Sequence, residues 1–428
     1  MMILVLGSGA REHALIRSLC TEDAGHTVVA APGNAGIASD VETVPLDPCD
    51  PNQVVAFAIE RAVELVIVGP EAPLVAGVAD AVRAAGIPVF GPDASAAQLE
   101  GSKTYAKRIM DAAGVPTGRA ILAADIDAAR TAIDEFGAPY VVKADGLAAG
   151  KGVLVTEDRE AALAHVTHWL PHGSVLVEEF LTGPEVSLFF VSDGESVRAL
   201  APAQDFKRLG DDDLGPNTGG MGAYSPLPWL DELFGSEQAF VTEVTDTVAL
   251  PTVRQMAAEH TPFIGLLYCG LILTPQGVRV IEFNARFGDP ETQVVLPRLV
   301  TPLSTVLLAA ATGTLSELPA LAFSPLVAVT VVLASEGYPE SPVTGRPITG
   351  LGEAAAVPGV SVLHAGTGLQ PNDELVSAGG RVLSVVALGK DFGSARSRVY
   401  EAVSQIGFTG AQYRTDIAAG AGTGTGTK

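Results

Sequence analysis

The chain has 428 residues, of which 47% are hydrophobic and 18% are charged, so it is long enough to form several domains with large cores. Its 26 Lys and Arg residues are outnumbered by 49 Asp and Glu residues, which gives a formal net charge of -23. This excess argues against binding to nucleic acid or to an anionic membrane surface. Three cysteines, Cys20, Cys49 and Cys269, share no metal-binding or disulfide spacing, so we expect neither a zinc site nor a disulfide framework.

The amino-terminal residues and the apolar runs of the chain bear on its cellular location. No basic segment precedes the first strand pattern, and the longest apolar stretch, residues 296–311, is interrupted by Pro297, Arg298 and Pro302. We therefore expect a cytoplasmic protein with no membrane segment. Residues 421–428 contain only Ala, Gly, Thr and Lys, and we expect them to form a disordered tail.

Residues 2–92 alternate short β-rich runs with helical stretches. The predicted strands are residues 3–6, 27–30, 65–68 and 88–90. This alternation predicts a parallel sheet in a doubly wound domain. Ligands bind such sheets at the carboxyl ends of the strands, where the loops of residues 7–13, 31–36 and 69–74 follow.

The first of these loops resembles a dinucleotide-binding turn but lacks its decisive parts. Glu12 replaces the third glycine, and no acidic residue closes the second strand to bind a ribose hydroxyl. A dehydrogenase is therefore the weaker alternative. The loop either binds a substrate phosphate or carboxylate through backbone N–H groups at a helix start, or is a tight turn needed only for packing.

A second unit starts near residue 101, with strands predicted at residues 140–143, 153–155, 174–178 and 186–191. Its glycine-rich segment, residues 141–152, reads Val-Val-Lys-Ala-Asp-Gly-Leu-Ala-Ala-Gly-Lys-Gly and is followed by a strand pattern. Strand, loop and strand of this composition can hold phosphates, although a glycine-rich hairpin with solvated lysines is the alternative. A P-loop is excluded, because Gly152 stands where Ser or Thr must follow Lys151.

Two further segments complete the predicted organisation. Residues 204–226 form a long stretch with five glycines from Gly210 and both charge signs, which is typical of a functional loop, although a surface excursion is the alternative. From about residue 325 we expect a small α+β domain. Its predicted elements are strands at residues 327–334 and 381–388 and a helix at residues 394–406.

A pair of oxygen ligands ends a predicted strand over residues 278–284. The period of two places Glu282 and Asn284 on one face, and a carboxylate beside an amide oxygen suits Mg²⁺, which completes its octahedron with water and phosphates. Lys103, Lys143 and Lys151 could compensate triphosphate charge in a chain of such negative charge. The connection between residues 177 and 185 either offers backbone groups to an adenine edge and Glu185 to ribose hydroxyls, or is a plain acidic turn.

Together these segments resemble a known family. Their order is similar to that of the ATP-grasp superfamily. Within it, the chain resembles the glycinamide ribonucleotide synthetases of purine biosynthesis over nearly its whole length. The matching stretches are residues 9–14, 31–36, 68–74, 142–152, 215–226 and 281–292, and the run Gly-Pro-Asn-Thr-Gly-Gly-Met-Gly-Ala-Tyr-Ser-Pro is the most specific of them.

The resemblance implies an α/β multidomain fold: a Rossmann-like amino-terminal domain, an ATP-grasp core of two α+β subdomains, and a small α+β carboxyl-terminal domain. The implied boundaries are 1–100, 101–322 with a nucleotide-covering subdomain at about 120–190, 323–420, and the tail. It also implies that ATP, glycine and 5-phosphoribosylamine give glycinamide ribonucleotide, ADP and phosphate through glycyl phosphate, with Mg²⁺ or Mn²⁺. We expect a monomer, which leaves room for transient contacts with neighbouring purine-pathway enzymes.

Carried over residue by residue, the resemblance implies four groups of site residues. Glu282 and Asn284 would bind the metal, and Arg286, Asp289 and Lys143 would be catalytic, with Asp289 orienting Arg286. The nucleotide would contact Lys103, Lys143, Gly146, Gly150, Lys151, Gly152, Glu178, Glu179, Phe180 and Glu185. The substrates would contact Gly9, Arg11, Glu12, Asn34, Glu71, Asp205, Lys207, Asn217, Thr218, Gly219, Met221 and Arg286.

The chain also departs from the pattern of this family. Ser8, Ala10, Phe206 and Ala285 stand where Asn, Gly, His and Cys are more usual, and Phe206 puts a proton-transfer role at its position in doubt. Residues 271–273 lack the acidic metal ligand of many ATP-grasp enzymes, which leaves two protein ligands. An ATP-grasp ligase for another carboxylate and amine, and a non-catalytic nucleotide sensor, remain as alternatives, although a sensor would be expected to lack Glu282, Asn284 or Lys143.

Overall fold

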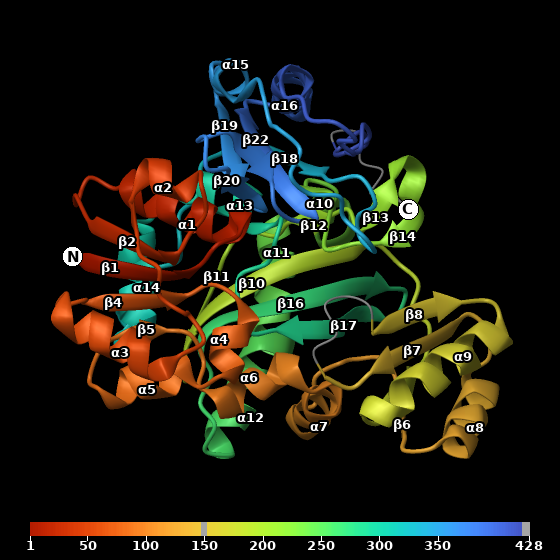
Figure 1. Cartoon of the computed structure of the whole chain (residues 1–428). Coiled ribbons are helices and arrows are strands. Elements are labelled where there is room, and N and C mark those ends of the chain that lie inside the picture. The colour runs from red at the N-terminus through yellow and green to blue at the C-terminus, as the bar shows by residue number, and fades with distance from the viewer. Residues whose placement is uncertain (147–151, 422–428) are drawn as a thin grey trace.

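The structure is a computed structural model that describes residues 1–146 and 152–421. The amino-terminal unit is built on a parallel sheet with the strand order β3-β2-β1-β4-β5 (Figure 1). All four predicted strands are present, and the two-residue β3 is added at the edge. The elements are β1 Met2–Gly7, α1 Ala10–Cys20, β2 Thr27–Pro32, α2 Ile37–Asp40, β3 Glu42–Thr43, α3 Pro51–Glu60, β4 Leu65–Val68, α4 Glu71–Val75, α5 Val78–Ala84, β5 Val89–Phe90 and α6 Ala94–Gly101.

A small lobe stands to one side of the molecule, on the right in Figure 1. Its antiparallel sheet has the order β6-β9-β7-β8, and its two long helices contribute to one buried apolar cluster with the sheet. The strands predicted at residues 140–143, 153–155 and 174–178 are confirmed. The elements are β6 Ala120–Ala123, α8 Ile126–Phe136, β7 Tyr140–Ala144, β8 Val153–Thr156, α9 Arg159–Trp169, η1 Leu170–His172 and β9 Val175–Glu178.

The centre of the molecule is an antiparallel sheet with the order β11-β10-β16-β17. Helix α7 (Lys103–Ala113) leads from the amino-terminal unit into this region. The other elements here are β10 Glu185–Asp193, β11 Val197–Ala199, α10 Leu230–Phe234, α11 Glu237–Val244, η3 Thr245–Ala249, α12 Leu250–Ala258, β16 Ile264–Thr274, β17 Gly277–Asn284, α13 Thr292–Val295, η4 Leu296–Arg298, α14 Leu303–Thr312 and η5 Leu315–Glu317.

A fourth sheet, with the order β12-β15-β18-β22-β19, corrects the interpretation of residues 204–226 as one long loop. Strand β15 (Gly222–Ser225) is buried and pairs with β18 (Val327–Ala334), so this sheet joins chain from both sides of the predicted boundary at residue 323. The predicted strands and helix near the end of the chain are confirmed. The remaining elements are β12 Gln204–Asp205, β13 Arg208–Gly210, η2 Asp211–Asp213, β14 Leu214–Asn217, α15 Leu351–Ala355, β19 Val360–His364, β20 Thr367–Leu369, β21 Leu375–Ser377, β22 Arg381–Gly389 and α16 Phe392–Gln405.

The end of the chain stays packed further than its composition suggests. Ile417, Ala418 and Ala421 are buried in the main apolar cluster, so the expected tail does not begin at Ala421. Residues 422–428 lie outside the described part of the chain. Among the described residues, no helix has both the length and the hydrophobicity needed to cross a lipid bilayer.

Candidate functional site

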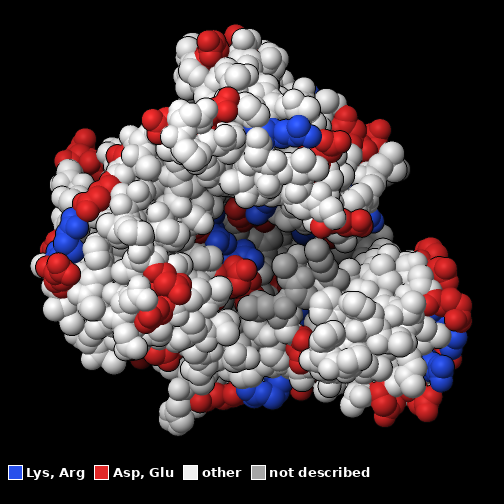
Figure 2. Space-filling model, viewed as in Figure 1, with Lys and Arg blue, Asp and Glu red and all other residues white. Residues whose placement is uncertain are grey.

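The predicted site residues gather around a hollow in the middle of the molecule. Figure 2 shows this hollow between the amino-terminal unit, the small lobe and the carboxyl-terminal sheet, with Lys, Arg, Asp and Glu side chains inside it. The charged groups of the predicted site form two sets, one of lysines and one dominated by arginines and acids.

The lysine set begins with Lys143 on β7. Its Nζ lies 2.8 Å from the Glu178 carboxylate on the neighbouring strand β9 and donates to the Ile281 carbonyl at 3.3 Å. Lys143 and Glu178 are diagonal neighbours on one face of the sheet, which explains their approach. The contact to Ile281 ties the small lobe to the end of β17, where the predicted metal ligands lie.

Two lysines of helix α7 complete this set. Lys103 Nζ donates to the Gly146 carbonyl at 3.2 Å, and Lys107 Nζ lies 3.5 Å from the second oxygen of Glu178. Burial lowers the pKa of both lysines despite the nearby carboxylates, foremost Glu282 for Lys103 and Glu178 for Lys107. Sequence reasoning missed Lys107, although its position four residues after Lys103 places it on the same helix face. Lys107 Nζ also donates to the Thr117 hydroxyl at 2.9 Å and to the Gly118 carbonyl at 2.8 Å, which are neutral partners and leave its charge compensated mainly by Glu178.

The predicted metal ligands lie at the end of β17, and a β-bulge aims them. The pairing with β16 shifts by one residue between Val280 and Glu282, so that Val280 and Phe283 both turn to the buried face. Glu282 and Asn284 consequently share the opposite, partly exposed face, as the period of two predicted. Bulges of this kind commonly re-aim side chains beside active sites.

The donor set at this end of β17 fits a magnesium or manganese ion. One carboxylate and one amide oxygen are hard ligands, and Glu282 is among the charges that act on Lys103 of the lysine set. No group of three or more His, Cys, Asp or Glu side chains within residues 1–146 and 152–421 could hold a metal. A two-ligand site of this type depends on phosphate and water for its remaining ligands.

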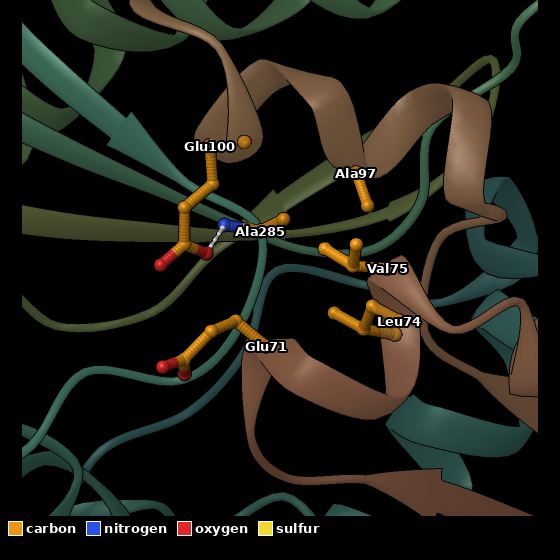
Figure 3. Close-up of a pocket in the computed structure, with 7 residues that line it drawn as sticks. Glu71, Leu74, Val75, Ala97, Glu100 and Ala285 are labelled. Atoms are coloured by element: carbon orange, nitrogen blue, oxygen red, sulfur yellow. Dashed lines mark hydrogen bonds between the residues drawn. The ribbon is translucent and has the colours of Figure 1, made fainter. Parts of the chain in front are cut away.

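Arg286 pairs with two acidic residues that lie far before it in the sequence. Its NH2 lies 3.0 Å from Glu100 Oε1, and its Nε lies 3.5 Å from Glu71 Oε2. Glu71, Glu100 and Ala285 line a small pocket, and Figure 3 shows both carboxylates on the same side of it. Glu100 also accepts the backbone N–H of Ala285 at 2.7 Å. Burial alone would lower the pKa of Arg286, but Glu100 and Glu71 raise it above its ordinary value. Asn284 Oδ1 lies 3.4 Å from the same guanidinium, which joins Arg286 to the metal pair.

The structure gives Asp289 a different partner from the expected one. Its carboxylate lies 3.2 Å from NH2 of Arg381 on β22, so the prediction that Asp289 orients Arg286 is wrong; Glu71 and Glu100 have that role. The Arg381 guanidinium also donates to the Asp289 carbonyl at 2.7 Å and to the Gly219 carbonyl at 2.6 Å. Asp289 thereby connects the end of the central sheet with the carboxyl-terminal sheet.

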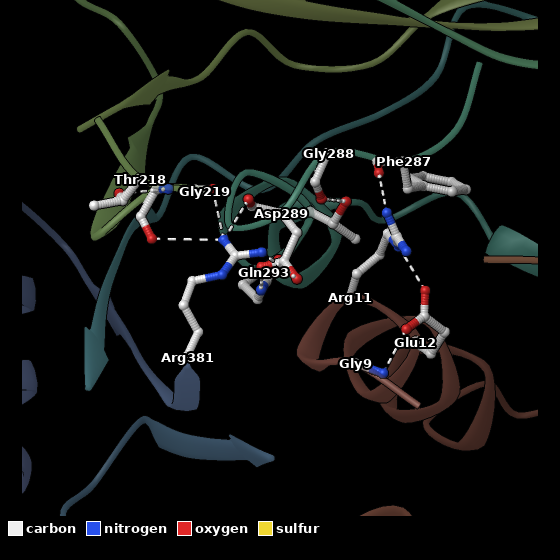
Figure 4. A network of polar contacts seen from close by, with 12 residues as sticks. Gly9, Arg11, Glu12, Thr218, Gly219, Phe287, Gly288, Asp289, Gln293 and Arg381 are labelled. Carbon is white, nitrogen blue, oxygen red and sulfur yellow. Dashed lines mark hydrogen bonds and ion pairs between the residues drawn. The ribbon is translucent and has the colours of Figure 1, made fainter. Parts of the chain in front are cut away.

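A second arginine fixes the same segment from the amino-terminal side. Arg11 on α1 donates to the Phe287 carbonyl at 3.1 Å and pairs with Glu12 at 2.5 Å, as Figure 4 shows beside the Arg381 network. Glu12 is buried and accepts the Gly9 N–H at 2.6 Å. A Cβ at Gly7 would approach Glu12 to 2.6 Å, so glycine provides the room for this carboxylate. Residues 287–289 are thus held by arginines from two other parts of the chain.

A chain of charges links the two sets. Lys207 Nζ lies 2.8 Å from Asp205 Oδ1 and 2.8 Å from Glu185 Oε2. Burial would lower the pKa of Lys207, but these two carboxylates raise it well above its ordinary value. Lys207, and secondarily Lys143, lower the pKa of Glu185. Glu185 therefore contacts Lys207 of the long segment and also interacts electrostatically with Lys143 of the lysine set.

Several predicted residues are already engaged within the protein. The Asn34 amide donates to the carbonyls of Ser8 and His364 and accepts two backbone N–H groups, so its predicted substrate contact has little free capacity. Met221 is fully buried, and its backbone N–H and carbonyl are both bonded. The Glu179 carboxylate pairs with Arg119 and Arg279, while its N–H donates to the Arg119 carbonyl.

The remaining predicted residues lie around the hollow or outside the described part. Phe180 is exposed, and Asn217 ends the exposed strand β14. Thr218 bonds the Lys207 carbonyl through its N–H and hydroxyl, and Gly219 N–H donates to the Tyr338 hydroxyl. Gly152 accepts from the Ala144 N–H. The predictions for Gly150 and Lys151 fall outside the described residues.

Sequence reasoning also missed a buried acid, Glu291, which directly precedes α13. Its Oε1 accepts hydrogen bonds from the Tyr268 hydroxyl at 2.9 Å and the Ser187 hydroxyl at 3.2 Å. Burial and the nearby Asp205 carboxylate raise the pKa of Glu291 to about 7. The only signal was its place in the charged run of residues 285–292, which does not distinguish a buried acid from an exposed one.

Comparisons with known proteins agree along the chain. Family models of phosphoribosylglycinamide synthetase match residues 1–100 (N domain), 101–292 (ATP-grasp A domain) and 328–420 (C domain). The phosphoribosylamine–glycine ligase of Leifsonia xyli is 70% identical, covering 98% of this chain and all of the relative. That of Streptomyces coelicolor is 60% identical, covering 98% and 99%. The crystal structure of the Thermotoga maritima phosphoribosylamine–glycine ligase has a TM-score of 0.80 at 32% identity, covering 97% of this chain and 100% of that one.

Proposed function

Because the chain belongs to the phosphoribosylglycinamide synthetase family, ATP-dependent ligases that join glycine to 5-phosphoribosylamine in purine biosynthesis, we propose that it does so through glycyl phosphate. A carboxylate is unreactive toward amines, so a glycine oxygen first attacks the γ-phosphorus of ATP and ADP leaves. The amine of phosphoribosylamine then attacks the activated carbonyl carbon, phosphate leaves, and the amine loses one proton. The family assignment sets aside the dehydrogenase and the non-catalytic sensor.

The observation that supports this proposal most strongly is the meeting of three features at one place. The lysine set of Lys103, Lys107 and Lys143 favours a polyanion, because burial depresses the pKa of the first two. Glu282 and Asn284 end a strand beside them, and the guanidinium of Arg286 is 3.4 Å from Asn284. A magnesium or manganese ion bound by Glu282 and Asn284 would offset triphosphate charge.

We assign the two ends of the hollow to the two kinds of substrate. Lys103, Lys107 and Lys143 bind the phosphates of ATP, the connection from Glu178 to Phe180 carries the adenine, and Glu185 accepts ribose hydroxyls. Gly146 and Gly152 flank the segment predicted to cover the triphosphate, and residues 147–151 of that segment lie outside the described part of the chain.

Arg286 binds the glycine carboxylate or the transferring phosphoryl group, since its planar fork matches either anion. The loops that contain Gly9, Asn34 and Glu71, together with residues 205–221, hold phosphoribosylamine. Asp289 acts with Arg381 in fixing the segment between these sites. Every residue assigned to the site comes from one chain, so a monomer would suffice for the reaction. We also propose a cytoplasmic location.

Positional isotope exchange tests the glycyl phosphate step without phosphoribosylamine. ATP labelled with ¹⁸O in the β,γ-bridge is incubated with the enzyme, Mg²⁺ and glycine, and we expect label to move to non-bridging β positions only when glycine is present. In parallel, hydroxylamine should trap glycine hydroxamate. Absence of both glycine-dependent exchange and hydroxamate, in an enzyme that still forms glycinamide ribonucleotide, would exclude a free-standing glycyl phosphate step.

A further inference from the structure

Glu291 differs from the other buried acids of the hollow in the kind of partner it has. Glu12, Glu100 and Glu178 each lie within 4.0 Å of an arginine or lysine nitrogen. Glu291 is 3% exposed, and the side chains that donate to it within the described chain are the neutral hydroxyls of Tyr268 and Ser187. A carboxylate paired with a cation is a poor base, whereas one bonded to neutral donors in an apolar setting keeps its affinity for a proton.

The titratable groups that act on Glu291 come from β12 and the residues that follow it, from β16, and from the residues that follow β17. The Asp205 carboxylate on β12 raises its pKa, and the Lys207 ammonium lowers it. Tyr268 on β16 lowers it through the hydrogen bond, and Arg286, after β17, interacts with it electrostatically. On its own segment, Asp289 is engaged with Arg381. The net result, dominated by burial, is a pKa of about 7, where a group can accept and release protons at working pH.

The position of Glu291 also matches the second half of the reaction. Its hydrogen-bond partner Tyr268 lies on β16 directly opposite Asn284 of β17. The charges that act on Glu291 include Arg286, which we assign to the glycine end, and Asp205 and Lys207 of the segment assigned to phosphoribosylamine. The other oxygen of Glu291, Oε2, lies against Gly288, where a Cβ would approach to 2.6 Å. Glycine at this position therefore leaves the carboxylate its room. Gly288 and Glu291 belong to one segment, and Arg11 and Arg381 fix it through the carbonyls of Phe287 and Asp289.

We propose that Glu291 accepts the proton that the amine of phosphoribosylamine loses when it attacks glycyl phosphate. The nitrogen lone pair forms the C–N bond, the carbonyl carbon–phosphate oxygen bond breaks, and phosphate leaves with that electron pair. The amine proton passes to the Glu291 carboxylate and then to solvent or to the departing phosphate, so charge and atoms balance. This assignment rests on the proposed function, and it separates the two chemical steps, because phosphoryl transfer to glycine needs no base at the amine.

The test compares the two steps in Glu291→Gln, which keeps the size and the hydrogen-bond acceptor but cannot take a proton. We expect glycine-dependent isotope exchange in β,γ-¹⁸O-labelled ATP to stay within a few fold of the parent enzyme. Amide formation in single-turnover rapid-quench experiments should fall by about 10² to 10⁴-fold. Glu237→Gln is the matched control, because Glu237 is another acid whose pKa burial raises, and its Oε2 accepts the N–H of Leu227, which is not a residue assigned to the site. It should change neither rate.

Two conservative variants test the role of Glu291 as proton acceptor through the pH dependence of amide formation. Tyr268→Phe removes a bond that stabilises the ionised carboxylate, so the acidic limb of the single-turnover amide rate should move to higher pH. Asp205→Asn removes a negative charge, so the limb should move to lower pH. Equal losses of exchange and amide formation in Glu291→Gln, or limbs that do not move in opposite directions, would overturn the assignment. No exchange in the parent enzyme would instead count against the glycyl phosphate step.

Discussion

The cations at the two ends of the hollow differ in how completely the protein compensates them. On the nucleotide side, burial outweighs the nearby carboxylates and lowers the pKa of Lys103 and Lys107. On the substrate side, carboxylates outweigh burial and raise the pKa of Arg286 and Lys207. Both groups lie in one hollow, so the difference comes from the number and closeness of their acidic partners.

This difference separates two uses of positive charge. An under-compensated lysine gains when a polyanion arrives, because the anion restores the stability of its charged form. A compensated arginine is already stable and is held rigidly by its acids, so it can present a fixed geometry to a small anion. The end that we assign to the nucleotide is thus suited to binding charge, and the end that we assign to the other substrates is suited to positioning them. Changes on each side should affect different steps.

The largest effect should follow from the acid that serves the nucleotide end. Glu282→Ala removes one of the two proposed metal ligands, and the loss of several kcal/mol of charge stabilisation would correspond to about 10³-fold or more in metal-dependent turnover. The fold should persist, because Glu282 is only partly buried at the end of β17. Steady-state rates across a Mg²⁺ titration and circular dichroism are the measurements. Glu374→Ala, at an exposed position in the carboxyl-terminal region, is the control. Normal turnover in Glu282→Ala would remove this residue from the metal site.

A smaller loss should follow from a change at the positioning end. Arg286→Lys keeps the charge but cannot reach Glu71, Glu100 and Asn284 together, so we expect kcat/KM for glycine to fall by about 10² to 10³-fold. The retained charge should limit the loss of stability, which thermal unfolding measures. Arg346→Lys, a surface arginine 4.0 Å from Glu336, is the matched control. A proportionate fall in stability and turnover would mean that Arg286 has only a structural role.

The sequence predicted those parts of the site that depend on local order. The period of two placed Glu282 and Asn284 on one face, and four β-rich runs located the strands of the amino-terminal sheet. The bulge between Val280 and Glu282 could not be predicted, because it arises from pairing with β16 and no residue type in the sequence marks it. Simple alternation therefore describes residues 277–280 and residues 282–284 separately and fails between them, at Ile281.

Partners that are far apart in the chain were the main failure. Asp289 lies three residues from Arg286 but pairs with Arg381, which is 92 residues away. Likewise, β15 was read as loop because its four residues resemble a turn-rich run, yet burial against β18 makes it a strand. Such choices depend on which charged and apolar groups meet after the chain folds, and sequence spacing alone does not contain that information.

The smallest expected effect tests the lysine end alone and uses pH. Because burial lowers the pKa of Lys103 and Lys107 in the free protein, and bound phosphates would raise it again, nucleotide binding should take up protons at pH values between the lowered and the raised pKa. Affinity for a non-hydrolysable ATP analogue should therefore decline as pH rises through this window. If the bound nucleotide raises the pKa of one lysine by about one unit, the affinity declines by at most about tenfold on account of that lysine. Calorimetry in buffers of different ionisation enthalpy measures the proton uptake.

Lys107→Met sharpens this measurement, because it removes one of the two titrating groups while the hydrogen-bonded Lys143–Glu178 pair remains. Proton uptake should decrease, and affinity near neutral pH should fall by about tenfold, the scale of one charge-assisted contact. Lys390→Met, at an exposed lysine, should leave both unchanged. If the parent enzyme binds the nucleotide without proton uptake, or if Lys107→Met does not reduce it, the lysines are as fully compensated as Arg286. The contrast between the two ends of the hollow would then lose its basis.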